Sequence, residues 1–370
     1  MNPDFSAQRE RFLGAATAAG ASLREYRHPL SGPRGEALAT DVAVLGDPCA
    51  QRFLVALSGT HGVEGYYGSD CQTRWLRELA GRSLPDGVAV MMIHLINPWG
   101  TAWCRRVNED NIDLNRNYLD FNQPLPANEA YAALHEIYAC GQLQGLERLR
   151  ADALLAARIR KQGWSALMSI VEAGQYRFAD GLFYGGQAPA WSNRTLHGIL
   201  REYLAHARVA ACFDLHTGAG EYGHPMLMSI ARAAHPGLAD ARALYGPWLY
   251  TLLTGADSHS DTGVAATATG YTSQALIDAL RHVHLMPFVV ECGTYPGEQI
   301  HTHLRNDHWL HLHGDPGDSV GRRIKQDLLE QFYPADQDWR DLVWLRTRQV
   351  WERALAALSR IHPPESAPSA

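Results

Sequence analysis

The chain has 370 residues, of which 46% are hydrophobic, with a formal net charge of −6 and an isoelectric point of about 6.3. This length and apolar content allow a large hydrophobic core. The lack of a basic excess argues against nucleic acid as a partner, and six widely spaced cysteines without a C-x-x-C pair are typical of reduced thiols in a cytoplasmic protein.

Four short apolar segments predict buried strands. Residues 52–57 run into a Gly-containing loop, and residues 67–79 then show polar side chains at helical spacing. Three further apolar runs follow, at 88–96, 209–215 and 287–290. Because such continuous apolar strands alternate with helical segments, they predict a mostly parallel sheet that is covered on both faces.

The remaining long segments read as helices or as a tail. Residues 128–171 are rich in Ala, Leu, Arg and Glu and predict a helical insertion between the second and third strands, and residues 336–361 predict a closing helix. The Pro/Ser/Ala-rich residues 363–370 are expected to be disordered. We therefore expect one domain over residues 1–362 with a helical insertion at about 128–171.

The sequence gives no sign of a membrane partner. Residues 1–6 lack a basic segment followed by an apolar stretch, so no signal peptide is predicted. No apolar run approaches the roughly 18 residues that a transmembrane helix needs. The composition does not decide whether the protein is a monomer or a homo-oligomer, so a homo-oligomer stays possible.

Two segments carry side chains of the kinds that form a catalytic zinc site. His61 and Glu64 lie in Ser-Gly-Thr-His-Gly-Val-Glu-Gly at 58–65, and His216 lies in Phe-Asp-Leu-His-Thr-Gly at 213–218. Two histidines and one carboxylate leave a fourth coordination position for water. A His-x-x-Glu pair alone is common by chance in a chain with 18 histidines. The prediction therefore depends on where the pair lies.

Each of these residues lies at the end of a predicted strand. His61 and Glu64 follow the first strand, His216 follows the third, and Glu291 ends the fourth. In open α/β sheets, ligands bind outside the carboxyl ends of the strands. A carboxylate directly after Phe-Val-Val is expected to be partly buried, which requires a metal, a partner or a raised pKa. A buried salt bridge is the alternative for Glu291.

Several motifs together resemble the M14 zinc carboxypeptidase superfamily. They are Gly-Thr-His-Gly-Val-Glu-Gly at 59–65, Asn-Pro-Trp-Gly at 97–100, Asp-Leu-Asn-Arg-Asn at 113–117 with an arginine seven residues earlier, Asp-Leu-His-Thr-Gly at 214–218 and Glu-Cys-Gly-Thr at 291–294. Within that superfamily the chain resembles the bacterial DUF2817 branch, near the succinylglutamate desuccinylase/aspartoacylase group. The resemblance covers about residues 50–300.

The resemblance implies a fold and a cofactor. It implies an α/β/α sandwich of three layers around a mixed, mostly parallel sheet of roughly eight strands. A mixed sheet differs from the purely parallel sheet that the apolar runs alone suggest. The resemblance also implies one Zn²⁺ per chain, held by His61, Glu64 and His216.

The resemblance also implies roles for five more residues. Glu291 would be the general base, and Arg106 would stabilise the oxyanion, although Arg105 beside it is a competing arginine. Asn115 and Arg116 would grip the free carboxylate of the substrate, and Asp113 would orient a zinc-binding imidazole, that of His61. Surface solvation or a structural ion pair is the alternative for each arginine.

Two further features have competing interpretations. Tyr271 lies twenty residues before Glu291, and the resemblance implies that it is the mobile tyrosine that carboxypeptidases carry over the substrate; a packing or surface tyrosine is the alternative. Tyr222 competes with it for a place in the site. The histidines between 282 and 313 suggest a second metal site. Their spacing matches no zinc signature, so hydrogen-bonded or solvent-facing imidazoles are the simpler interpretation.

Three functions remain open from the sequence. The first is a metallocarboxypeptidase that removes a C-terminal residue from a peptide or peptide-like substrate. The second is a small-molecule deacylase of the aspartoacylase type, which cleaves an N-acyl amino acid. The third is a carboxylate-binding protein without catalysis, which the presence of every proposed ligand and of Glu291 disfavours.

Overall fold

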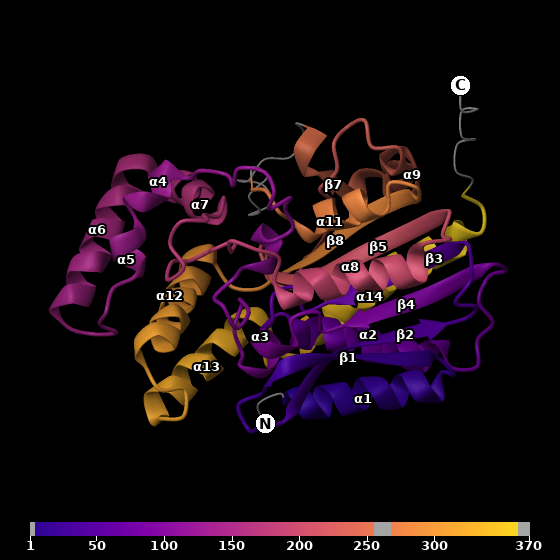
Figure 1. Cartoon of the computed structure of the whole chain (residues 1–370), viewed down its shortest axis with the longest axis horizontal. Coiled ribbons are helices and arrows are strands. Elements are labelled where there is room, and N and C mark those ends of the chain that lie inside the picture. The colour runs from indigo at the N-terminus through magenta and orange to yellow at the C-terminus, as the bar shows by residue number, and fades with distance from the viewer. Residues whose placement is uncertain (1–3, 255–267, 362–370) are drawn as a thin grey trace.

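The computed structural model describes residues 4–254 and 268–361, and it is built around one eight-stranded sheet (Figure 1). The strand order is β1-β2-β4-β3-β5-β8-β6-β7. The strands are β1 (Ser22–Ser31), β2 (Ala37–Leu45), β3 (Arg52–Ser58), β4 (Val88–His94), β5 (Val209–Gly218), β6 (Pro225–Ser229), β7 (Leu249–Thr251) and β8 (His284–Gly293).

Helices cover both faces of this sheet (Figure 1). They are α1 (Phe5–Ala18), α2 (Gly65–Leu79), α3 (Pro98–Ala102), α4 (Glu129–Ala132), α5 (His135–Tyr138), α6 (Leu146–Gln162), α7 (Trp164–Glu172), α8 (Trp191–Leu204), α9 (Gly237–Tyr245), α11 (Thr272–Ala279), α12 (Gly297–His313), α13 (Ser319–Phe332) and α14 (Gln337–Leu358), with short 3-10 turns η1 (Leu114–Arg116), η2 (Gly246–Trp248) and η3 (Leu252–Thr254).

The sheet is parallel at its centre and mixed at its edges. Strands β4, β3, β5 and β8 are parallel neighbours, whereas β1 with β2, β2 with β4, and β6 with β8 are antiparallel. The predicted α/β/α sandwich with a mixed, mostly parallel sheet is therefore confirmed. All four predicted strands are present, and β8 is longer than predicted, so Glu291 lies two residues before its end.

The alternation of side chains along the strands produces two cores. On one face, Leu54 and Ala56 of β3 pack with residues of α1, α2 and α14, where the rings of Trp75 and Trp351 lie 4.9 Å apart. On the other face, Phe53 packs with residues of α8 and α11. Because both faces are covered, the central strands carry the continuous apolar runs of a buried parallel sheet.

The predicted helical insertion corresponds to α4, α5, α6 and α7, which share a small hydrophobic cluster of their own. This group lies against α12, where His301 Nε2 is 3.0 Å from the hydroxyl of Tyr138 and Arg305 pairs with Asp152 at 2.7 Å. The predicted disordered tail at 363–370 lies outside the described residues. Among the helices that are described, none is long and apolar enough to cross a membrane.

Candidate metal centre

The loop that carries His61 and Glu64 is fixed by backbone contacts with a second motif. The N–H groups of Gly62 and Val63 donate to the carbonyls of Arg106 at 3.0 Å and Arg105 at 2.8 Å. A Cβ at Gly62 would lie 2.1 Å from the carbonyl carbon of Gly100, so only glycine permits this approach. The two motifs thus hold each other in place.

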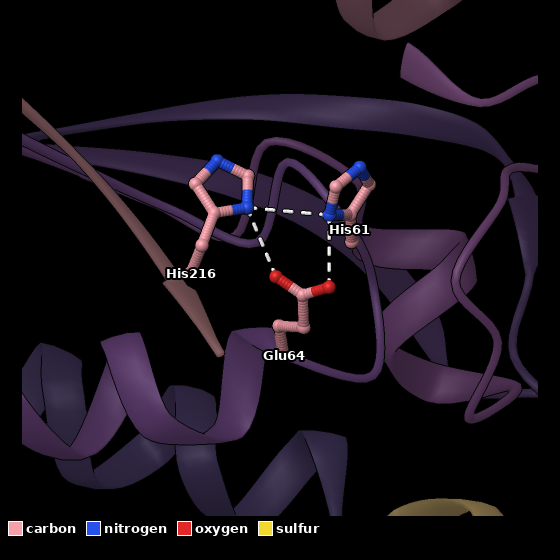
Figure 2. A group of neighbouring side chains, drawn as sticks. All are labelled: His61, Glu64 and His216. Atoms are coloured by element: carbon pink, nitrogen blue, oxygen red, sulfur yellow. Dashed lines mark hydrogen bonds and ion pairs between the residues drawn. The ribbon is translucent and has the colours of Figure 1, made fainter. Parts of the chain in front are cut away.

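Figure 2 shows the three predicted zinc ligands, His61, Glu64 and His216, converging on one point. Their candidate ligand atoms all lie within 4.8 Å of one another. Nδ1 of His61 is 2.8 Å from Glu64 Oε1, Nδ1 of His216 is 2.9 Å from Glu64 Oε2, and the two Nδ1 atoms are 3.2 Å apart. All three side chains are buried. The donor set and its convergence suit a divalent cation such as zinc.

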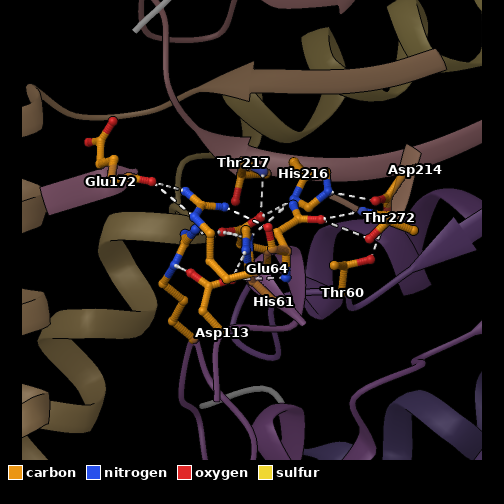
Figure 3. Close-up of polar contacts among 12 residues, drawn as sticks. Thr60, His61, Glu64, Asp113, Glu172, Asp214, His216, Thr217 and Thr272 are labelled. Atoms are coloured by element: carbon orange, nitrogen blue, oxygen red, sulfur yellow. Dashed lines mark hydrogen bonds and ion pairs between the residues drawn. The ribbon is translucent and has the colours of Figure 1, made fainter. Parts of the chain in front are cut away.

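The outward ring nitrogens of both histidines face carboxylates (Figure 3). Nε2 of His61 lies 3.2 Å from Asp113 Oδ1, and Nε2 of His216 lies 2.9 Å from Asp214 Oδ2. Asp214 also accepts a hydrogen bond of 2.8 Å from the Thr60 hydroxyl. A carboxylate on the second nitrogen fixes the tautomer and orientation of a metal-binding imidazole.

The partner that was predicted for Asp113, His61, is the one that the structure places beside it. Asp214 was missed by the sequence analysis, although a signal was present. Alternate residues of a strand point to the same face, so the aspartate two positions before a histidine in β5 lies beside it.

The protonation preferences of the cluster favour positive charge at its centre. Burial opposes ionisation of Glu64, but His61 and His216 outweigh it and hold the pKa of this carboxyl well below its usual value. Burial likewise opposes a charged His216, but Asp214 and Glu64 raise the pKa of the imidazole well above its usual value. The surrounding carboxylates therefore stabilise a cation at this position.

Glu291 lies beside His216 because β5 and β8 pair in parallel with these two residues in register. It lines the same pocket and accepts a hydrogen bond of 3.0 Å from the Ala219 N–H. Burial and the nearby Glu64 carboxylate raise the pKa of Glu291 to about 7. A carboxyl group with this pKa can both accept and release a proton near neutral pH.

The structure separates the two competing arginines. Arg106 lines the pocket, where its Nε donates to Asp113 at 3.1 Å and its Nη1 donates to Glu64 at 3.2 Å. Arg105 instead points away into a buried ion pair of 3.1 Å with Asp307. Of the two arginines, Arg106 is therefore the one that lines the pocket of the metal cluster.

Asn115 and Arg116 both line the pocket, and each is oriented by its neighbours. The amide oxygen of Asn115 accepts hydrogen bonds from the N–H of Thr272 at 3.0 Å and from its hydroxyl at 2.8 Å. The guanidinium of Arg116 donates to the carbonyls of Glu172 and Asn115. A Cβ at Gly270, where φ is +81°, would lie 2.6 Å from the Arg116 carbonyl oxygen.

Since Thr272 occupies the oxygen of the Asn115 amide, the NH₂ group is the part left to donate to a ligand. Thr272 was missed by the sequence analysis, and no local pattern identified it. The amide and the guanidinium together form a set of donors for a carboxylate.

Two aromatic rings flank the arginines. Phe183, with φ of +52°, places its ring 5.1 Å from the guanidinium of Arg106 and 5.7 Å from that of Arg116. The ring of Tyr271 lies 5.2 Å from the Arg116 guanidinium and lines the pocket. Tyr222 is 46% exposed and bonds to Asp336 at 3.0 Å, so of the two predicted candidates Tyr271 is the one that lines the pocket.

The late histidines do not come together. His282, His284 and His308 bond to the Leu204 carbonyl, the Asp240 carboxylate and the Asp180 carbonyl, respectively. The cluster of His61, Glu64 and His216 is the candidate metal-binding group found within the described residues. His282, His284 and His308 are thus hydrogen-bonded imidazoles, whereas His311 and His313 are exposed.

A family described as "Protein of unknown function (DUF2817)" matches residues 2–346, nearly the whole chain. The chain belongs to the DUF2817 family. No curated protein matches this DUF2817 protein.

Solved structures are similar to this DUF2817 protein at low identity and with TM-scores below 0.5. Bovine thrombin-activatable fibrinolysis inhibitor, in complex with tick carboxypeptidase inhibitor, is 12% identical with a TM-score of 0.47 over 98% of this chain and 99% of that chain. Carboxypeptidase A from Helicoverpa armigera is 11% identical with a TM-score of 0.45, and the match covers 96% of this chain and 74% of that chain. The succinylglutamate desuccinylase from Chromobacterium violaceum is 14% identical with a TM-score of 0.37, and the match covers 88% of this chain and 74% of that chain. The function is therefore inferred from the site itself.

We expect Asp214→Asn to weaken zinc binding by about 10- to 100-fold, because the variant loses the carboxylate that orients His216. Competition with a chromogenic chelator measures the affinity. Asp278→Asn in the DUF2817 protein is the matched control, since Asp278 lies on an exposed part of α11 and bonds to Arg281. Equal zinc affinity of the folded Asp214→Asn variant and the wild type would show that Asp214 does not orient a ligand.

Proposed function

We propose that this protein is a zinc-dependent hydrolase that cleaves an amide bond next to a free carboxylate, as a metallocarboxypeptidase does on a peptide or peptide-like substrate. One observation carries the proposal. The His61–Glu64–His216 cluster, the carboxyl group of Glu291 and the donors of Asn115 and Arg116 all line a single pocket of about 350 Å³. Such a volume suits a small ligand or the end of a peptide.

The metal in this proposal is held by His61, Glu64 and His216. The donor set, the convergence of the two Nδ1 atoms on Glu64 and the carboxylates behind both rings support this assignment. A zinc ion bound there would polarise the scissile carbonyl and acidify a water molecule.

The side chains around the metal would carry the proton and charge transfers. Glu291 would accept a proton from the attacking water and deliver it to the leaving nitrogen, so that it ends the reaction as it began. Arg106 would donate to the oxygen that becomes negatively charged when the carbonyl carbon is attacked. Its bonds to Glu64 and Asp113 hold the guanidinium in advance of the reaction.

Asn115 and Arg116 would fix the substrate by its free carboxylate. The guanidinium is held by backbone carbonyls, and the Asn115 amide is turned by Thr272, so both groups are oriented before the substrate arrives. Preorganised donors lower the entropic cost of positioning a scissile bond. Tyr271 would cover this end of the pocket, where its ring contacts Arg116.

A small-molecule N-acyl amino acid deacylase would use the same residues, because its substrate carries the same carboxylate beside the same kind of bond. The pocket volume suits an N-acyl amino acid as well as a peptide end. A binding protein without catalysis would retain the carboxylate site but would need no base at Glu291. Hydrolysis assays with peptides and N-acyl amino acids distinguish these functions.

We also propose a cytoplasmic location, because all six cysteines are unpaired. Helices α4 to α7 would form an insertion within one domain that spans residues 1–362. Their contacts with α12 support that arrangement.

We expect Glu291→Gln to retain zinc while kcat falls by at least about a hundredfold, the usual scale for a general base. Glutamine is nearly isosteric with glutamate but accepts no proton at neutral pH. Single-turnover hydrolysis is measured with the metal content of the same sample. Glu10→Gln, at an exposed position of α1, is the control. A zinc-loaded Glu291→Gln variant that hydrolyses at the wild-type rate would exclude Glu291 as the base.

We expect amidation of the substrate's free carboxylate to lower kcat/KM by roughly 30- to 1000-fold, because a charge-assisted contact with Arg116 is lost. Steady-state kinetics on free and amidated forms of one substrate give this ratio. In Arg116→Ala the ratio should fall close to one, since the carboxylate has lost its partner. Equal rates on both forms with the wild-type protein would show that Asn115 and Arg116 are structural.

A further inference from the structure

The pocket has an outer arm that the zinc cluster and the carboxylate donors do not use. Its walls come from the insertion helix α7 and from α12, which begins shortly after Glu291. The apolar and aromatic side chains that line it are Trp164, Met168, Phe183, Ile300, His301 and Leu304, and the exposed Ser165 follows Trp164 in the same wall.

Helix α7 connects this arm to the carboxylate site. The carbonyl of Glu172 at its C-terminal end holds Arg116, and Trp164 stands at its N-terminal end. Nine helical residues span about 12 Å. A substrate whose carboxylate meets Arg116 can therefore extend along α7 toward Trp164.

The side chains of the arm are packed against their neighbours as well as apolar. The rings of Trp164 and His301 meet edge to face at 5.4 Å, and His301 Nε2 lies 3.0 Å from the hydroxyl of Tyr138. A Cβ at Gly297 would lie 3.6 Å from Trp164 Nε1, so the indole rests on the first turn of α12. Burial lowers the pKa of His301 to about 3, and the imidazole is therefore neutral. Preformed apolar walls of this kind favour apolar groups.

The pocket offers one cationic partner, Arg116, for a carboxylate of the substrate. Among the described residues, the arginines and lysines that line it are Arg106 and Arg116, and Arg106 already bonds to Glu64 and Asp113. The stretches outside the description, 1–3, 255–267 and 362–370, contain no lysine or arginine. A second carboxylate on the acyl side would enter this apolar arm with no lysine or arginine among the described pocket-lining side chains left to pair with it, which is unfavourable.

We propose that the arm between α7 and α12 selects an apolar, preferably aromatic, acyl group on the substrate, and that it rejects dicarboxylic acyl groups such as succinyl. This inference rests on the proposed amide hydrolysis and names its substrate class. Trp164 is the residue that determines the preference, because it stands at the far end of the arm and its indole is packed between His301 and Gly297.

The test compares three amides of one amino acid: N-(3-phenylpropanoyl)-leucine, N-acetyl-leucine and N-succinyl-leucine. We expect kcat/KM to be at least about tenfold higher for the phenylpropanoyl compound than for the succinyl compound. Trp164→Ala should lower kcat/KM for the phenylpropanoyl compound by about tenfold or more and for acetyl-leucine by less than about threefold. Leu154→Ala, at a 58% exposed position of α6, should change neither.

A second variant keeps the test independent of the folding of Trp164→Ala. Ser165 is exposed and lines the arm, so Ser165→Arg places a cation there without disturbing the core. It should raise kcat/KM for succinyl-leucine relative to acetyl-leucine by about two- to fivefold at low salt, whereas the neutral control Ser165→Gln should not.

The outcomes separate this inference from the proposed function. A kcat/KM for succinyl-leucine equal to or higher than that for the phenylpropanoyl compound would overturn the inference alone. Equal losses of kcat/KM on all three amides in Trp164→Ala would do the same. Failure to hydrolyse any of the three amides would overturn the proposed function and the inference with it.

Discussion

An excess of buried negative charge at one edge of the sheet is the constraint on which the rest of this structure depends. Glu64, Asp113, Asp214 and Glu291 are each at most 8% exposed and lie around one point. Among the arginines that the structure describes, Arg106 is the one whose guanidinium hydrogen-bonds to these carboxylates, at Asp113 and Glu64. Buried carboxylates in such number are tolerable only with a compensating cation. A divalent metal between the two imidazoles would supply it.

The fold generates this concentration of charge by bringing strand ends together. The register of β5 with β8 places His216 beside Glu291, and β3 on the other side of β5 leads directly into the loop of His61 and Glu64. The insertion then adds what the sheet cannot supply. Through the Glu172 carbonyl it holds Arg116, and through α7 it extends the pocket away from the metal. The sheet thus positions the proposed chemistry, and helices α4 to α7 would shape the space for the proposed substrate.

The sequence predicted the features that are local in the chain. Apolar runs identified β3, β4, β5 and β8, because strands buried on both faces have a continuous hydrophobic signal. Strand β1 was not predicted, since it is an edge strand whose residues are mostly exposed and polar. The antiparallel pairs of the sheet were predicted only by the family resemblance, because a hydrophobic pattern does not indicate the direction of a strand.

For the site, too, residues with a local signal in the sequence were predicted and residues placed by tertiary contacts were not. His61, Glu64 and His216 were predicted because they follow strands that were themselves recognisable, and the structure brings them together. Thr272, Phe183 and Trp164 were not predicted. Their places depend on tertiary contacts with Asn115, Arg116 and His301, to which residues far away in the chain contribute. Asp214 could have been found from its spacing to His216 alone.

The central claim is that the buried carboxylates and imidazoles hold a zinc ion that the reaction requires. Elemental analysis of the protein purified without added metal, together with amide hydrolysis in the presence and absence of phenanthroline, tests it most directly. We expect one zinc per chain, loss of hydrolysis on chelation, and little zinc in His216→Ala purified in parallel. Zinc well below one per chain in a protein whose hydrolysis is unaffected by phenanthroline would contradict the account.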